Sequence, residues 1–160
     1  MAEITLGQVT ATLAARPSPA VAASAPTRQS AVLNVSEAKA RASFSFEEPD
    51  YLPDDFELDE AAFVDNPGEM VLLSYSSQRG NFVLVFAPLA RFQAGDDGKR
   101  RYLVVAESLV ESTVDGVQAA LAQQAGAALG IVWEKGGRLN HILGQGLSES
   151  ELGRIAASIS

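Results

Sequence analysis

The strongest constraint on the fold comes from residues 131–160, which have the pattern of a β-hairpin followed by a capped helix. An apolar run at its start is followed by the turn signal Gly136-Gly137 and by a second, alternating stretch. Ser148 and Glu151 then stand at the spacing of a capping box, in which each side chain accepts a hydrogen bond from the other residue's backbone N–H. The apolar residues that follow recur at helical spacing and form one stripe: Leu152, Ile155, Ala156 and Ile159.

Shorter patterns upstream complete the prediction of the fold. A helix is expected at 36–41, and apolar runs separated by turn residues predict strands at 44–46, 56–64, 70–75, 82–86 and 102–106. The pattern is typical of an α+β protein. We predict an antiparallel sheet of about five to seven strands, with the 149–159 helix packed on one face and a short N-terminal helix.

Residues 117–129 fit two structures. Their alanine content favours a helix by intrinsic propensity. Asp115-Gly116, however, is a hairpin turn signal, and alternation after it favours a strand. Periodicity does not decide between them.

Composition divides the chain in two. Residues 1–30 are rich in alanine, proline and serine, and their prolines interrupt helical patterns. We predict that this segment is a flexible tether, mobile and dispensable, with some helix between Leu6 and Ala15. Residues 31–160 are predicted to form a single α+β domain.

Charge and residue content exclude several classes of protein. A formal net charge of −8 and a pI near 4.6 argue against a nucleic-acid partner, because phosphates attract clustered lysine and arginine. The absence of cysteine excludes disulfides and thiolate metal sites. No apolar stretch approaches the roughly 18 residues of a transmembrane helix, and Glu3 replaces the basic start of a secretory signal. Any membrane tether is therefore expected outside the given sequence.

A set of short motifs, spread from residue 32 to residue 160, resembles a known family. The motifs are Pro49-Asp50-Tyr51-Leu52-Pro53, the strand Val71 to Tyr75, Val114-Asp115-Gly116-Val117, Val132-Trp133, and Leu147 to Leu152. Their order resembles a functionally uncharacterised bacterial domain at the extracytoplasmic C-terminus of anti-sigma-factor-like membrane proteins and in related lipoproteins. The resemblance implies an antiparallel sheet with a flanking helix, a strand at 117–121, an extracytoplasmic location and no catalytic residues. The chain departs from the family at Asp55, where a glycine is expected, and in the alanine content of 123–129.

Acidic residues concentrate in one stretch. No lysine or arginine lies between Arg41 and Arg79. The same stretch contains ten of the 20 acidic residues: Glu47, Glu48, Asp50, Asp54, Asp55, Glu57, Asp59, Glu60, Asp65 and Glu69. Such a stretch fits a docking face for a basic partner, a Ca²⁺ site, or a solvated sheet edge whose charge discourages aggregation. The alternating ligand pattern of a Ca²⁺ loop is absent. The candidate interaction face is Asp50, Asp54, Asp55, Glu57, Asp59 and Glu60.

The other candidate residues are more simply explained by structure. His141 is the only histidine and stands on a predicted strand, so we expect a structural or surface role. Gly144-Gln145-Gly146 lacks the third glycine of a dinucleotide fingerprint, and Lys99-Arg100-Arg101 shares its loop with two aspartates. Aromatic residues at strand spacing are expected in the core rather than in a ligand groove: Tyr75, Phe82, Phe86 and Trp133.

The lack of a catalytic constellation and the expected tether favour a non-enzymatic sensor or interaction domain, and the resemblance implies that it is extracytoplasmic and forms the C-terminal part of a membrane-bound anti-sigma-factor-like regulator. No catalytic residue, cofactor or metal ligand is predicted, and the partner is an unidentified protein or small ligand. One alternative is a small hydrolase or other ligand-processing enzyme that uses acids between residues 47 and 69. Two or more carboxylates converging in a concave pocket would favour it. A purely structural module is the other alternative.

Overall fold

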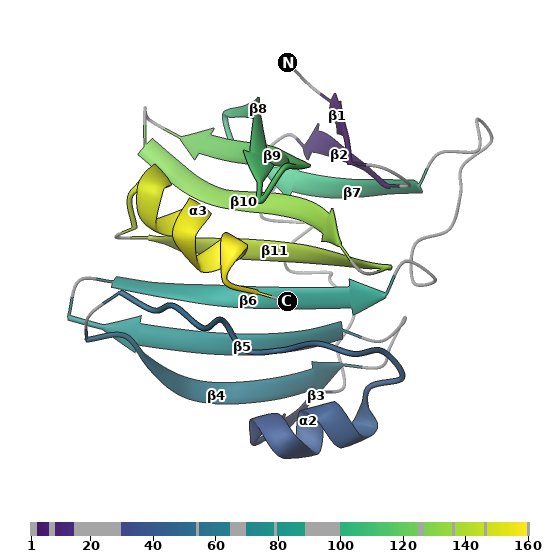
Figure 1. The fold of residues 1–160 in the computed structure, drawn as a ribbon, viewed down its shortest axis with the longest axis vertical. Coiled ribbons are helices and arrows are strands. Elements are labelled where there is room, and N and C mark those ends of the chain that lie inside the picture. Colours follow the sequence, from purple (N-terminus) through teal and green to yellow (C-terminus); the bar gives the residue numbers. More distant parts are fainter. Residues whose placement is uncertain are drawn as a thin grey trace, which may run out of the picture.

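The largest element of the fold is one antiparallel sheet. The computed structural model describes residues 3–6, 9–14, 30–53, 55–64, 70–78, 80–88, 100–124, 127–135, 137–145 and 147–159 (Figure 1). The large sheet has eight strands in the order β3-β4-β5-β6-β11-β10-β9-β8. Its strands are β3 (Ser30–Leu33), β4 (Glu57–Val64), β5 (Met70–Ser77), β6 (Gly80–Pro88), β8 (Ser108–Val114), β9 (Val117–Gln124), β10 (Ala127–Lys135) and β11 (Arg138–Gln145).

A small sheet and two helices complete the described fold. The small sheet has the order β1-β2-β7, with β1 (Glu3–Thr5) antiparallel and β7 (Arg100–Val105) parallel to β2 (Val9–Ala14). The helix α2 (Val35–Arg41) packs against β4, and α3 (Glu149–Ala157) packs against β10 and β8. The predicted α+β class, with an antiparallel sheet and a C-terminal helix on one face, is confirmed. No helix in the described part is long and apolar enough to cross a membrane.

The main core lies between one face of the large sheet, α3, and the segment that leads into β4. Strand alternation creates it: in β5, the buried Val71, Leu73 and Tyr75 alternate with half-buried residues. Its largest fully buried side chains are Phe46, Leu73, Tyr75, Phe82, Leu84, Phe86, Leu121, Trp133, Ile142 and Leu152. The aromatic residues of the sequence pattern are therefore core residues, as expected.

Residues 42–53, here called the crossing segment, run across the main-core face without joining the sheet (Figure 1). Phe46 stacks on Phe86 of β6, with ring centroids 5.2 Å apart. At its far end the backbone N–H of Tyr51 donates to Ser158 Oγ at 3.1 Å. The strand predicted at 44–46 is wrong, because the apolar side chains of this segment pack onto the face of the sheet and not beside an edge.

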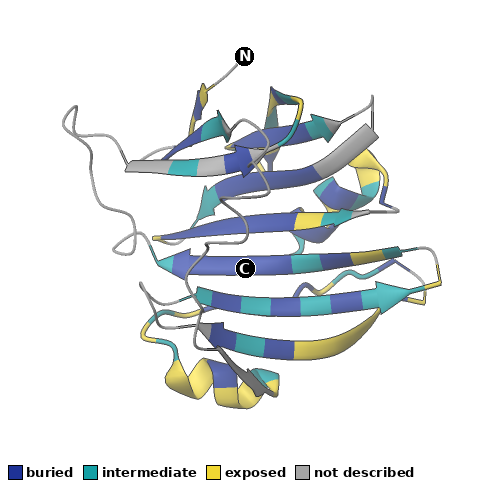
Figure 2. Ribbon diagram, turned by 180° about the vertical axis from the view of Figure 1, so that it is seen from behind, coloured by how far each residue is buried: buried dark blue, intermediate teal, exposed yellow. Residues whose placement is uncertain are grey.

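The N-terminal strands contribute to a second core on the opposite face of the sheet. Seen from behind, the small sheet lies over the β8–β11 half of the large sheet (Figure 2). Ile4, Leu6 and Val9 are at most 2% exposed there and pack with Val132 and Leu139. The tether interpretation is therefore wrong for residues 3–6 and 9–14, as is the helix expected from residue 6, while residues 15–29 lie outside the described residues.

The ambiguity resolves to strand at residues 117–124, which form β9, and at residues 127–129, which begin β10. Asp115 (φ 51°) and Gly116 (φ 81°) adopt left-handed backbone conformations, as the tight turn between β8 and β9 requires. The alanines of β9 lie on both faces of the sheet: Ala119 packs in the main core, and Ala120 and Ala122 in the second core. Tertiary packing on both sides overrides the helical propensity of alanine.

The helix termini follow local sequence signals. Around α3 the capping box is complete, since the backbone N–H of Glu151 donates to Ser148 Oγ and that of Ser148 donates to Glu151 Oε1, both at 3.1 Å. The helix α2 begins one residue earlier than predicted, and its cap is Asn34, whose Oδ1 accepts from the backbone N–H of Glu37 at 2.8 Å.

Candidate functional site

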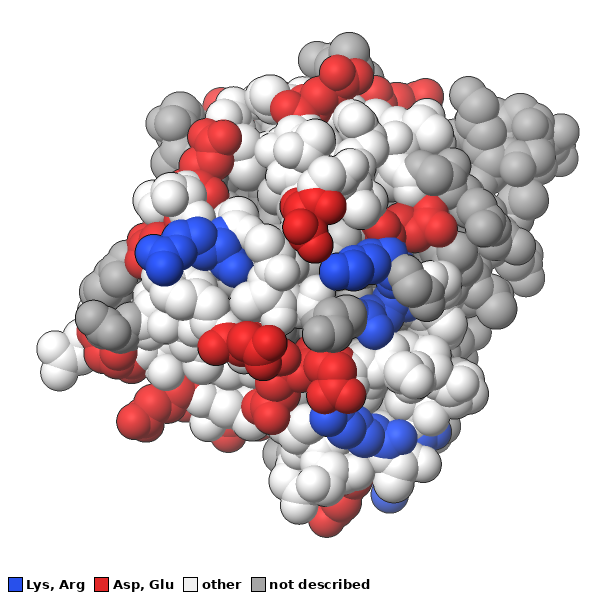
Figure 3. Space-filling view, viewed as in Figure 1, with Lys and Arg blue, Asp and Glu red and all other residues white. Residues whose placement is uncertain are grey.

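The candidate acidic residues extend from the crossing segment to the first half of β4 in sequence. Asp50 and Asp55 precede the strand, and Glu57, Asp59 and Glu60 are within it; all five are exposed and are called the acidic strip here. Asp54, Asp65 and Glu69 lie outside the described residues. Figure 3 shows acidic side chains on the face that carries the crossing segment. The five described residues of the predicted interaction face are exposed to solvent.

The acidic part of β4 forms a free strand edge in the described part of the chain. The neighbouring β3 pairs with residues 61–64 alone, so no described strand pairs with the outer side of residues 57–60. On the inner side a register shift lies between Leu58 and Glu60, opposite β5. Asp59 occupies this bulge. Charge and a bulge at an edge strand both discourage unspecific pairing with another sheet.

The turn that enters β4 explains the departure at Asp55. Asp55 has φ 69°, a left-handed conformation that glycine adopts at no steric cost and that aspartate tolerates better than most residues. The backbone N–H of Phe56 donates to the carbonyl of Pro53 at 3.3 Å and closes the turn. Asp55 therefore adopts the backbone conformation expected of the glycine, and its side chain adds a carboxylate to the acidic strip.

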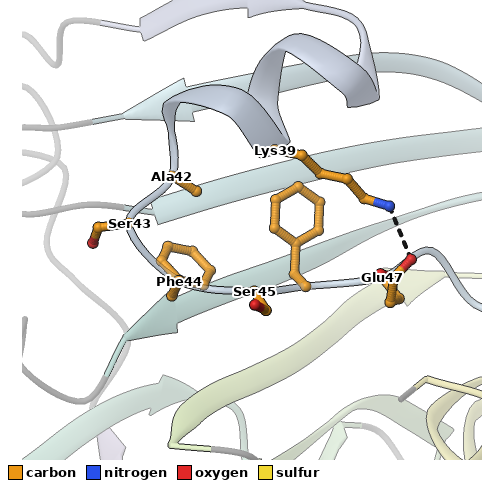
Figure 4. Close-up of a pocket in the computed structure, with 7 residues that line it drawn as sticks. Lys39, Ala42, Ser43, Phe44, Ser45 and Glu47 are labelled. Carbon is orange, nitrogen blue, oxygen red and sulfur yellow. Dashed lines mark hydrogen bonds and ion pairs between the residues drawn. The ribbon is translucent and has the colours of Figure 1, made fainter.

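A shallow pocket of about 270 Å³ lies beside the C-terminal end of α2 (Figure 4). Its lining residues are Lys39, Ala42, Ser43, Phe44, Ser45, Phe46 and Glu47. Lys39 Nζ and Glu47 Oε2 form an exposed ion pair at 2.8 Å. The hydrogen bond and the charge of Lys39 hold the pKa of Glu47 below its usual range. The pocket contains a single carboxylate, so it lacks the convergent acids that the enzyme alternative requires.

The described acids do not assemble elsewhere. Within the ranges that the structure describes, no three His, Asp or Glu side chains come together in a group that could hold a metal ion. The Ca²⁺ alternative therefore gains no support from these residues.

His141 lies at the junction of the two sheets and has a structural environment. It is 6% exposed, and its Nδ1 lies 2.7 Å from the hydroxyl of Tyr102 on β7. The two rings meet edge to face, with centroids 5.4 Å apart. Burial lowers the pKa of His141 from 6.5 to about 4, so the imidazole is neutral at pH 7. The expected structural role is consistent with this geometry.

A buried arginine, absent from the sequence predictions, ties the crossing segment to the sheet. Arg138, at the start of β11, is 5% exposed; its Nε donates to Asn140 Oδ1 at 2.7 Å and its Nη1 to the carbonyl of Ser45 at 2.6 Å. Its guanidinium also lies over the Phe86 ring, 5.2 Å from the centroid. Burial lowers the pKa of Arg138, and the charge of Glu47 offsets part of that effect. Next to a glycine turn, an arginine is ordinarily a solvated residue, so the sequence holds no signal for this contact.

Two polar groups of the main core have no hydrogen-bond partner in the described structure, Tyr75 Oη and Trp133 Nε1. Burial raises the pKa of Tyr75, and the charge of Glu48 adds to the effect. The Tyr75 ring stacks on Phe82 at 4.8 Å. Neither group lines the pocket beside α2.

Comparison with models of known protein families found no match, and neither did comparison with curated proteins or with solved structures. The resemblance to the anti-sigma-factor-like proteins therefore stays a prediction based on short motifs.

Proposed function

We propose that this chain is a non-enzymatic extracytoplasmic sensor or interaction domain that binds a basic partner through the acidic strip. The observation that carries the proposal is the placement of Asp50, Asp55, Glu57, Asp59 and Glu60. All five are exposed, from the crossing segment to the first half of β4, in a stretch of sequence without lysine or arginine. Clustered charge of one sign attracts partners of the opposite sign and accelerates their association.

The surroundings of the strip support binding rather than catalysis. A hydrolase that uses paired carboxylates needs them to converge on a substrate inside a cleft. The carboxylates of the strip lie on solvent, and Glu47 in the pocket is paired with Lys39. Carboxylates that project into solvent are suited to recognise a positively charged surface.

Within this proposal, the domain belongs to a membrane-bound anti-sigma-factor-like regulator. The motifs around Tyr51, Trp133 and Ser148 support the assignment, and the complete capping box agrees with the family pattern at that end. The sequence of the gene upstream of this chain tests it. A transmembrane helix preceded by a zinc-binding helical domain is expected, and an upstream region coding for an unrelated soluble enzyme would contradict it.

Binding to an oligoarginine peptide tests the acidic strip. The variant Glu57→Gln/Asp59→Asn/Glu60→Gln should bind about tenfold more weakly at low ionic strength, because it removes three adjacent charges. The control Glu3→Gln/Glu107→Gln/Glu111→Gln changes the net charge equally at three other exposed acids and should bind like the wild type. Equal weakening of both variants would mean that net charge alone attracts the peptide, and the strip would then have no specific role.

A further inference from the structure

The contact between the two sheets contains small side chains on one side. The large sheet contributes Leu109, Ala120, Ala122, Val132 and Leu139 to the second core, and three of these are alanine or valine. Small residues remove little apolar surface from water, and the free energy of burial scales with that surface. The docking of the small sheet is therefore the part of the fold that one polar interaction can influence most.

His141 and Tyr102 form such an interaction. His141 is on β11 of the large sheet, and Tyr102 is on β7 of the small sheet. When Nδ1 accepts the hydroxyl proton of Tyr102, Nε2 carries a hydrogen, and Nε2 is buried without a partner in the described structure. Protonation would place a charge on this buried ring and reverse the direction of the hydrogen bond, while Nε2–H would stay unsatisfied.

We infer that His141 and Tyr102 form an acid-sensitive latch, which holds the small sheet on the large sheet when the imidazole is neutral and releases it when His141 is protonated. Release would uncover the second-core face of β8 to β11. The domain would then report a fall in external pH through an apolar surface that is hidden at neutral pH. The latch does not depend on the acidic strip and stands or fails independently of it.

Few groups near His141 could stabilise an imidazolium. On β6 and β10 the residues paired with it are Val85 and Val132. The acid of β10 that shares a face with Val132 is Glu134, two residues further along the strand. It pairs with Leu139 and is half-buried. On β7, Arg100 is two positions before Tyr102, and on β2 the second core receives Val9 and Ala11. Desolvation is the cause that lowers the pKa of His141, and no charge from the part of the chain that the structure describes compensates for it.

The expected size of the effect follows from proton linkage. A histidine that binds protons at pKa 6.5 when exposed and at about 4 when docked shifts the docking equilibrium toward release as pH falls between these values. Between pH 7.5 and pH 4.5, the equilibrium constant for opening should rise about 70-fold. Above pH 6.5 the effect is absent, because His141 is then neutral in both the docked and the open state.

Hydrogen exchange of the full chain at pH 7.5 and pH 4.5, corrected for intrinsic exchange rates, tests the latch. Amides of β1, β2 and β7 should lose protection by about 70-fold in the wild type and by less than about threefold in His141→Asn, whose amide can still bond Tyr102 but does not titrate. Amides of β5 should stay better protected than those of β7 at pH 4.5, because they exchange only when the main core unfolds, and the fluorescence of Trp133, which lies in the main core, should stay unchanged. A weak pH dependence in the wild type, an equal loss in His141→Asn, or equal protection of β5 and β7 at pH 4.5 would overturn the inference.

A direct titration keeps the inference testable if His141→Asn does not fold. The NMR signals of the single imidazole should titrate far below 6.5 in the wild type. In Tyr102→Phe, which removes the hydroxyl, the small sheet should open more at every pH while the dependence on His141 remains. An imidazole that titrates near 6.5 with no change in the amides of β7 would exclude the latch.

Discussion

Replacing Ile155 with alanine should destabilise the domain far more than removing the cap of the same helix. Ile155 is fully buried in the main core, where α3 packs on β10 and β8. Truncating a buried isoleucine removes its transfer free energy and leaves a cavity, at a cost of about 2–5 kcal/mol. The cavity should collapse little, because Ser158 Oγ, which also donates to the Ile155 carbonyl, accepts from Tyr51 of the crossing segment. We expect a loss of about 3 kcal/mol.

The cap contributes less because it is exposed. Ser148→Ala removes the oxygen that accepts from the backbone N–H of Glu151, and water can replace it. Such a loss typically costs about 1 kcal/mol. Ser150→Ala is the matched control, since Ser150 is an exposed serine of the same helix. It should leave the free energy of unfolding within about 0.5 kcal/mol of the wild type.

Urea denaturation followed by Trp133 fluorescence measures all three variants, because this single tryptophan is buried in the same core as Ile155. With a typical dependence of about 2 kcal/mol per molar urea, the midpoint should fall by about 1.5 M for Ile155→Ala and about 0.5 M for Ser148→Ala. A midpoint of Ile155→Ala equal to that of Ser150→Ala would refute the reasoning. The apolar stripe of α3 would then be a surface that awaits a partner helix.

Three further predictions concern other parts of the fold. Gly130→Ala should lower the melting temperature because the new methyl group would collide with the carbonyl oxygen of Ile142, whereas Gly153→Ala, with no atom within 4 Å, should stabilise α3 by up to about 1 kcal/mol. Deleting residues 1–14 should lower the melting temperature by about 5 °C or more, since it removes buried side chains of the second core; an unchanged value would restore the tether interpretation. As pH falls from 6.5 to 4, the unfolded state takes up a proton at His141 before the folded state does, so stability should fall by about 3 kcal/mol more in the wild type than in His141→Asn, as urea titrations at several pH values can measure.

Local signals predicted the elements whose structure is decided locally. The Ser148–Glu151 spacing needs only one turn of helix to form its capping box, and Asp115-Gly116 needs only the backbone of its own turn. The N-terminal strands could not be recognised in this way. Val9 of β2 pairs with Arg100 of β7, a partner remote in sequence, and alanine-rich composition does not reveal such a pairing.

The residues of the candidate site also differ in how far the sequence predicts them. Exposed carboxylates follow from composition, because charged residues are rarely buried without a partner. The buried polar groups depend on tertiary contacts: Arg138 is buried only because the crossing segment offers the carbonyl of Ser45, and His141 because β7 offers Tyr102. Phe44 and Phe46 alternate with serines as residues of a strand would. The packing of Phe46 on Phe86, which the sequence does not reveal, places this segment across the face of the sheet and not at its edge.

The most direct test of the central claim maps the binding surface residue by residue. Amide chemical shifts of the ¹⁵N-labelled chain are followed while an oligoarginine peptide is added at low ionic strength. We expect the largest changes in amide chemical shift at Asp50, Asp55 and residues 57–60. No change is expected at Glu107, which precedes β8, or at Glu111 within β8, although both are exposed acids. Changes of equal size at Glu107 and Glu111 would contradict the account, because attraction would then follow net charge and the acidic strip would not be a binding face.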